Sequence, residues 1–182
     1  MDQIPTQLVE IEQPRGMAPV RLDERGRMKV PPLMKAYLEK FPDKQLWVTS
    51  LDRTIGRIYP LLIWRETEKF LDRLTEDPGL AERLAFNAAD LGEEVEMDGQ
   101  GRIVIPLTLR KTLGIEDQTV RLRVFRGYIE ILSERMYEER RTISSGSAQE
   151  DVLRATGLGM GKIEKILVPL KETPSEPEQS GS

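Results

Sequence analysis

Two short stretches of the sequence combine an acidic residue, a glycine and an arginine at the same spacing. LDERGRMKVP begins at Leu22, and MDGQGRIVIP begins at Met97, which is 75 residues later. In both stretches an aspartate lies three residues before a Gly-Arg pair, and strand-forming residues and a proline follow. A carboxylate in this position can accept backbone N–H bonds within a turn, and glycine supplies the positive φ that closes the turn. The pattern predicts two stiff turns, each holding an arginine in a fixed direction.

An arginine held in this way is suited to binding a nucleic acid. A guanidinium can form two parallel hydrogen bonds to a guanine edge, a contact worth about 1–3 kcal/mol of discrimination between bases. We expect Asp23 to pair with Arg27, and the second motif offers the same pair in Asp98 and Arg102. An exposed pair contributes only about 0–1 kcal/mol to stability, so its expected role is to orient the guanidinium. The turn residues are Asp23, Gly26, Asp98 and Gly101.

A purely structural turn is the simpler alternative for a single copy of this motif. The charge distribution favours a functional turn, although the 182-residue chain has a net charge of −4. Residues 21–65 carry a net charge of +5, residues 66–96 a net charge of −7, and residues 97–127 a net charge of +3. Each motif therefore lies in a basic segment, and an acidic segment separates the two. This arrangement is compatible with a nucleic-acid partner, because the local field at the contact surface matters more than the total charge.

The chain has no histidine and no cysteine. Imidazole catalysis, Ser-His-Asp triads, disulfides and His- or Cys-ligated metal sites are therefore excluded. No carboxylate pair stands out among the 31 acidic residues, so we expect no enzyme, no catalytic residue, no metal, no cofactor and no small-molecule substrate. The longest apolar stretch, residues 61–64, is too short to span a bilayer, and the N-terminus lacks the apolar run of a signal peptide. We expect a cytoplasmic protein with no membrane partner.

The expected elements recur in the same order around the two motifs. Each motif lies between β-type runs and is followed by a short helix, further β-type runs and a longer helix, which predicts an internal duplication. We expect Trp64 and Phe70 in a core. Helix caps are expected at Asp77, Gly114 and Ser133. The predicted divisions are an N-terminal arm (1–16), a first repeat (17–76), a connecting helix (77–92), a second repeat (93–142), and a linker with a mostly disordered C-terminal tail (143–182).

The two motifs and the elements around them resemble the MraZ family, which comprises bacterial transcription regulators of the AbrB-like swapped-hairpin class. The similarity extends from about residue 17 to residue 142. The resemblance implies an α+β fold, namely a duplicated AbrB-like swapped-hairpin β-barrel with short helices and a pseudo-twofold axis, whose subunits form a homo-oligomeric ring. It also implies that the motif arginines face double-stranded DNA. The ring would engage short repeats in the promoter of the division and cell-wall gene cluster, which places the protein at the nucleoid.

The expected DNA-binding residues lie in or beside the two motifs and are Arg25, Arg27, Lys29, Lys35, Arg102, Arg110 and Lys111. Arg25 and Arg27 are expected at base edges, whereas lysines mostly meet phosphates. In the second motif, Gln100 takes the place of Arg25. This difference predicts either stronger binding by the first motif or a structural role for the second. A ring would raise affinity through effective concentration, by roughly two to four orders of magnitude.

Two other classes of protein stay open at this stage. The first is an AbrB-class, antitoxin-like interaction protein whose C-terminal extension masks a toxin, and copurification of a small partner would support it. The second is an enzyme that works without histidine or cysteine, and hydrolysis dependent on a single carboxylate would support it. A specific DNA footprint would favour the regulator over both.

Overall fold

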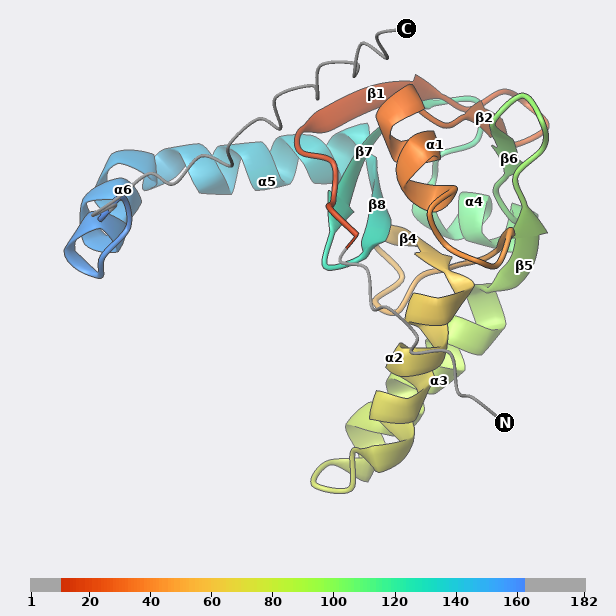
Figure 1. The fold of residues 1–182 in the computed structure, drawn as a ribbon, viewed down its shortest axis with the longest axis horizontal. Coiled ribbons are helices and arrows are strands. Elements are labelled where there is room, and N and C mark those ends of the chain that lie inside the picture. Colours follow the sequence, from red (N-terminus) through yellow and green to blue (C-terminus); the bar gives the residue numbers. More distant parts are fainter. Residues whose placement is uncertain (1–10, 163–182) are drawn as a thin grey trace, which may run out of the picture. The chain divides into compact units, whose positions relative to one another are not determined.

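In the computed structural model, which describes residues 11–162, the chain has an α+β fold whose strands are all paired antiparallel (Figure 1). Six strands form one sheet and two strands form a second. The elements in chain order are β1 (Met17–Arg21), β2 (Arg27–Lys29), α1 (Pro32–Leu38), β3 (Gln45–Thr49), β4 (Gly56–Pro60), α2 (Leu61–Arg73), α3 (Pro78–Leu91), β5 (Glu93–Glu96), β6 (Arg102–Val104), α4 (Leu107–Leu113), β7 (Thr119–Phe125), β8 (Tyr128–Ser133), α5 (Glu134–Gly146) and α6 (Ala148–Gly157). The predicted α+β class is confirmed.

The same order of elements, β-β-α-β-β-α, occurs from β1 to α2 and again from β5 to α5, with α3 between them. The large sheet has the strand order β1-β7-β8-β4-β3-β5. This order reads the same in reverse when each strand is exchanged for its counterpart in the other half. In the small sheet, β2 pairs with β6, and Met28 lies opposite Ile103, which is 75 residues further along the chain. The strands of the two halves are therefore interleaved in both sheets.

The main core is built from apolar side chains of both halves. Met28 and Ile103 are each 1% exposed. Val30 and Ile105, again 75 residues apart, are also buried. Burying an apolar side chain of this size stabilises the fold by about 1.5–3 kcal/mol. Because successive side chains of a strand point to opposite faces, β2 and β6 are left with an outward face of exposed residues.

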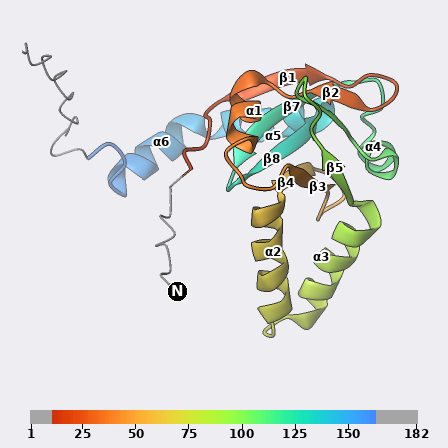
Figure 2. The ribbon, with the colours of Figure 1, turned by 45° about the vertical axis from the view of Figure 1, so that its right-hand side comes forward.

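The helices α2 and α3 lie side by side as an antiparallel hairpin that extends away from the sheets (Figure 2). At the base of this hairpin, the ring of Trp64 is buried and stacks on Trp47 with the centroids 5.6 Å apart. The predicted core position of Trp64 is confirmed. The same prediction is wrong for Phe70, which is 62% exposed. Leu71 takes the buried position instead, because it lies two helical turns after Trp64 and so on the same face.

The helix ends follow the sequence signals. At the start of α3, the side chain of Asp77 accepts the backbone N–H of Leu80 at 2.9 Å. Gly114 ends α4 in the left-handed region with a φ of 64°. At the start of α5, Ser133 Oγ accepts the backbone N–H of Met136 at 3.2 Å. The three predicted caps are confirmed.

The chain divides into two compact units, Met1–Thr142 and Ile143–Ser182. A linker is predicted after Thr142, but α5 continues to Gly146 and α6 follows, so this expectation is wrong for residues 143–157. The start of α6 carries Glu150 and Asp151 and its last turn carries Arg154, charges that suit the helix dipole. The rest of the predicted tail, residues 163–182, and residues 1–10 of the predicted arm lie outside the described residues. No helix within residues 11–162 is long and apolar enough to cross a membrane.

Candidate nucleic-acid interface

The first loop, residues 23–27, is organised by the carboxylate of Asp23. Its Oδ1 accepts the backbone N–H groups of Arg25 at 2.9 Å and Arg27 at 2.8 Å, and its Oδ2 accepts Arg27 Nε at 2.8 Å. Gly26 closes the turn with a φ of 76° and donates its N–H to the carbonyl of Asp23 at 2.9 Å. The backbone bond from Arg27 contributes most to lowering the pKa of Asp23 below its usual value. The aspartate thus stays ionised and fixes the direction of the guanidinium.

The second loop, residues 98–102, has the same set of bonds. Asp98 Oδ1 accepts the backbone N–H groups of Gln100 and Arg102, both at 2.9 Å, and Oδ2 accepts Arg102 Nε at 2.8 Å. Gly101 has a φ of 76°, the same as its counterpart in the first loop. The backbone bond from Arg102 is again the main cause of a lowered pKa, here that of Asp98. The two loops therefore present their arginines in the same way.

Each loop glycine lies under a basic side chain that comes from the other half. A Cβ atom at Gly26 would overlap the guanidinium of Arg110, and a Cβ atom at Gly101 would lie 2.8 Å from Cδ of Lys35. Lys35 and Arg110 are themselves 75 residues apart and so occupy equivalent positions in α1 and α4. Both places favour glycine because of the positive φ, and at Gly26 the fixed guanidinium of Arg110 also leaves no room for a side chain.

The sequence predicts Arg110 as a residue that meets DNA, and the structure corrects this expectation. Arg110 is only 7% exposed. Its Nη1 donates to the backbone carbonyl of Arg25 at 2.9 Å and to that of Ile105 at 2.8 Å. A guanidinium that is engaged with these carbonyls inside the fold does not reach a phosphate. Arg110 is instead a positioning residue, because it fastens the first loop to the second half of the chain.

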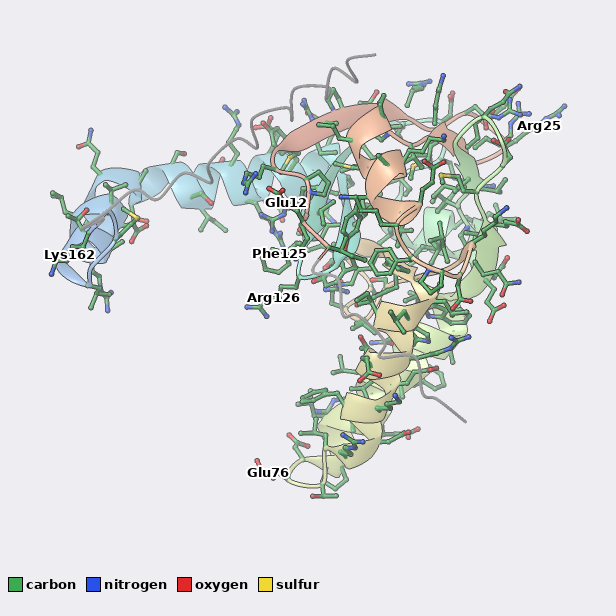
Figure 3. All side chains as sticks on the ribbon, in the orientation of Figure 1. Glu12, Arg25, Glu76, Phe125, Arg126 and Lys162 are labelled. Atoms are coloured by element: carbon green, nitrogen blue, oxygen red, sulfur yellow. The ribbon has the colours of Figure 1, made fainter. Side chains whose placement is uncertain are left out.

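The other candidate residues keep accessible charges. Arg25, Arg27, Lys29, Arg102 and Lys111 are exposed. Figure 3 shows Arg25 at the outer edge of the first loop, pointing away from the sheets. The side chain of Lys35 is 34% exposed, and its ammonium pairs with Glu39 at 2.8 Å. The aspartates bond the motif arginines through Nε, and no hydrogen bond engages the terminal nitrogens of those arginines within residues 11–162.

The small sheet joins the two motifs into one surface. Across β2 and β6, Lys29 lies directly opposite Arg102, and Arg27 lies opposite Val104. All four side chains are exposed. Like charges opposite each other on antiparallel strands are destabilising, and the carboxylate of Asp98, 2.8 Å from Arg102 Nε, offsets part of this repulsion. We call the exposed face of Arg27, Lys29 and Arg102 the basic ribbon.

Sequence reasoning missed this pairing and treated the motifs as separate. In β2 the sequence gives a local signal, because apolar Met28 lies between the charged Arg27 and Lys29. That alternation identifies an outward face. It does not identify which strand lies beside it, and here the partner strand is 75 residues away.

Comparison with known proteins places this chain in a family. A family model described as "MraZ protein, putative antitoxin-like" matches residues 91–155, which include the second loop. The Transcriptional regulator MraZ of Koribacter versatilis is 37% identical over 105 residues, covering 57% of this chain and 71% of the relative. That of Nitrosospira multiformis is 36% identical over 110 residues, covering 58% and 72%. That of Acidobacterium capsulatum is 27% identical over 137 residues, covering 75% and 93%.

These relatives carry the same name, which defines their class as transcriptional regulators. The chain belongs to the MraZ family. The family resemblance that the two motifs indicate in the sequence is thus confirmed.

Proposed function

We propose that this chain is a sequence-specific DNA-binding transcriptional regulator whose basic ribbon and two loops enter the major groove of double-stranded DNA. The observation that carries the proposal is the position of Lys29 opposite Arg102 on an exposed two-stranded ribbon. A major groove is wide enough to admit a two-stranded β-ribbon. Phosphate groups would compensate the like charges that the ribbon brings together.

Within this interface the residues have different roles. Arg25 and Arg27 of the first loop contact base edges, because Asp23 leaves the terminal nitrogens of Arg27 for a bidentate bond. Arg102 offers the same geometry from the second loop. Lys29, Lys35 and Lys111 meet phosphates, which hold the register without reading sequence.

The wider arrangement is part of the same proposal. The interleaved strands and the equivalent loops support a duplicated, swapped-hairpin barrel with a pseudo-twofold axis. A single ribbon offers few contacts, so subunits assemble into a homo-oligomeric ring that binds repeated short promoter boxes. Effective concentration then raises the affinity by roughly two to four orders of magnitude. The boxes precede the division and cell-wall gene cluster, and the protein acts at the nucleoid in the cytoplasm.

The test is a footprint on fragments selected from the host's own genomic DNA, with the mass in solution measured alongside. We expect clustered short repeats and a mass several times that of the 20.8 kDa chain. The double variant Arg25→Ala/Arg27→Ala should lose the footprint at moderate salt. The variant Lys69→Ala, which removes an exposed charge on α2, is the matched control and should keep it. A footprint that survives the double variant would refute the assignment of the first loop.

The antitoxin-like description of the matching family model favours a second candidate, an interaction protein. Large apolar side chains near α6 are also exposed, among them Leu153 at 74% and Leu158 at 84%. In this alternative, a small partner protein copurifies with the chain. Removal of residues 148–182 would abolish copurification and leave the DNA footprint unchanged. Copurification that persists after this removal would contradict the alternative.

A further inference from the structure

A cavity of about 680 Å³ opens beside the second loop. Its apolar lining is formed by Leu38 of α1, Phe41, Leu46 of β3, and Met97 at the end of β5. The acidic residues Glu39, Asp43, Glu96 and Asp98 also line it. A cavity of this size and composition suits a small organic molecule, since such sites measure about 300–1,000 Å³ and combine apolar walls with a few polar groups.

The equivalent place in the first half of the chain has an ion pair. There, Arg21 pairs with Asp117 at 2.6 Å. The next residue, Leu22, is fully buried and donates its backbone N–H to the carbonyl of Gln118 at 2.9 Å. An exposed ion pair and a backbone hydrogen bond thus join the end of β1 to the segment that leads into β7.

The second half has different residues in these equivalent positions. Arg21, the last residue of β1, corresponds to Glu96, the last residue of β5. Asp117, two residues before β7, corresponds to Asp43, two residues before β3. A guanidinium opposite a carboxylate is therefore replaced by two carboxylates. Met97, in the position of Leu22, is only partly buried.

The four acidic residues around this cavity differ in their ion pairs. Three of the four are compensated, since Asp43 pairs with Arg65 at 3.0 Å, Glu39 pairs with Lys35, and Asp98 pairs with Arg102. Glu96 makes no ion pair within residues 11–162. Lys44 is the cation among the lining residues and is exposed.

We propose that this cavity binds a small organic cation with an apolar body, whose amidinium or guanidinium group meets Glu96 in the place that Arg21 occupies in the first half. The apolar body rests on Phe41, Leu46 and Met97. Asp98 and Gly99 both line the cavity and begin the second loop. A bound ligand therefore changes the position or mobility of Arg102, which Asp98 holds. An effect of the ligand on DNA binding through Arg102 rests on the proposed function, whereas binding of the ligand does not.

The probe is benzamidine, and benzamide is its uncharged counterpart of nearly equal shape. Calorimetry on the full chain should show saturable binding of benzamidine, at least tenfold tighter than that of benzamide. The variant Glu96→Gln should weaken benzamidine binding at least fivefold. The variant Glu93→Gln changes the same strand outside the cavity lining and should bind as the parent does. Hydrogen exchange followed by mass spectrometry should slow in residues 97–102 and stay unchanged in residues 22–27.

Several results would overturn the proposal. They are equal binding of the two probes, unchanged binding by Glu96→Gln, slowed exchange in residues 22–27, and no binding at all because a second copy of the chain covers the site. Two further measurements distinguish failure of this proposal from failure of the proposed function. The DNA footprint of Glu96→Gln without benzamidine should equal that of the parent, and Arg25→Ala/Arg27→Ala should still bind benzamidine.

Discussion

The first and second loops have the same hydrogen bonds. They differ in the residue at the tip and in the side chain from the other half that covers the loop. Arg25 stands at the tip of the first loop, and Gln100 stands in its place in the second. Arg110 fastens the first loop through two backbone carbonyls, whereas Lys35 covers the second loop with its stem and pairs with Glu39. The turn geometry has thus been retained in both halves, while the tip and the clamp have diverged. This contrast predicts that the first loop is the stiffer and the stronger binder.

The largest effect is expected for the motif arginines. Arg27→Ala should lower DNA affinity by about 5–150-fold, which corresponds to the loss of about 1–3 kcal/mol of base contact. Arg102→Ala should cost clearly less, because its loop lacks a neighbouring arginine at the tip. The measurement is a binding titration at fixed salt, with Lys69→Ala as the control. Equal losses of DNA affinity for Arg27→Ala and Arg102→Ala would contradict the predicted difference between the two loops.

The next effect concerns the loop glycines. Gly26→Ala and Gly101→Ala both place a side chain at a φ of 76°, which costs about 1–2 kcal/mol. Gly26→Ala should cost roughly 1 kcal/mol more, because the overlapping guanidinium of Arg110 cannot move without losing a carbonyl bond. The flexible stem of Lys35 can move aside. Urea unfolding measures the difference, and Gly99→Ala, with open space around it, is the control. A larger loss of stability for Gly101→Ala than for Gly26→Ala would contradict the role of Arg110 in fastening the first loop.

A smaller difference is expected between the clamps themselves. Arg110→Met leaves the carbonyls of Arg25 and Ile105 without this donor, which costs about 1–3 kcal/mol. The lower end of this range is expected, because Arg110 Nε is itself buried without a partner within residues 11–162. Lys35→Met removes an exposed pair and should cost at most about 1 kcal/mol. Thermal unfolding of both variants measures the two losses of stability. A greater loss for Lys35→Met than for Arg110→Met would contradict the prediction.

The smallest difference is expected between the two aspartates. Folding lowers the pKa of both Asp23 and Asp98, so each stabilises the fold above the ordinary aspartate pKa of about 3.9. That stabilisation is lost as the pH falls through the folded-state pKa. Asp23→Asn and Asp98→Asn should each reduce the loss of stability between about pH 5 and pH 3, and by similar amounts, because their bonds are the same. Urea midpoints at both pH values test this, and unequal effects would show that the two frames differ in energy.

The parts of this fold that depend on neighbouring residues could be predicted from the sequence. The bonds of Asp23 and the caps at Asp77 and Ser133 join groups within four residues of each other. Pairing between distant strands could not be predicted. The position of Lys29 opposite Arg102 depends on that pairing and could not be predicted either. Residue type does not show that pairing, since both residues simply look exposed.

The wrong expectations have a common physical cause. Arg110 is a basic residue in a basic segment, and only the tertiary fold shows that backbone carbonyls surround its guanidinium. Phe70 falls within an apolar pattern, but the helical face that is buried is set by Trp64 and Leu71. The serine-rich stretch before α6 suggests a linker, yet its residues continue a helix. In each case a long-range contact or an extended helix outweighs local composition.

The contact of Arg110 with the first loop has a consequence for the independence of the two halves. A residue encoded in the second half determines the shape of a recognition turn encoded in the first, and Lys35 acts in the opposite direction. A half expressed alone would keep the local bonds of its aspartate and lose the side chain that covers its loop glycine. A second copy of the first half would bring Lys35, and not Arg110, to the first loop.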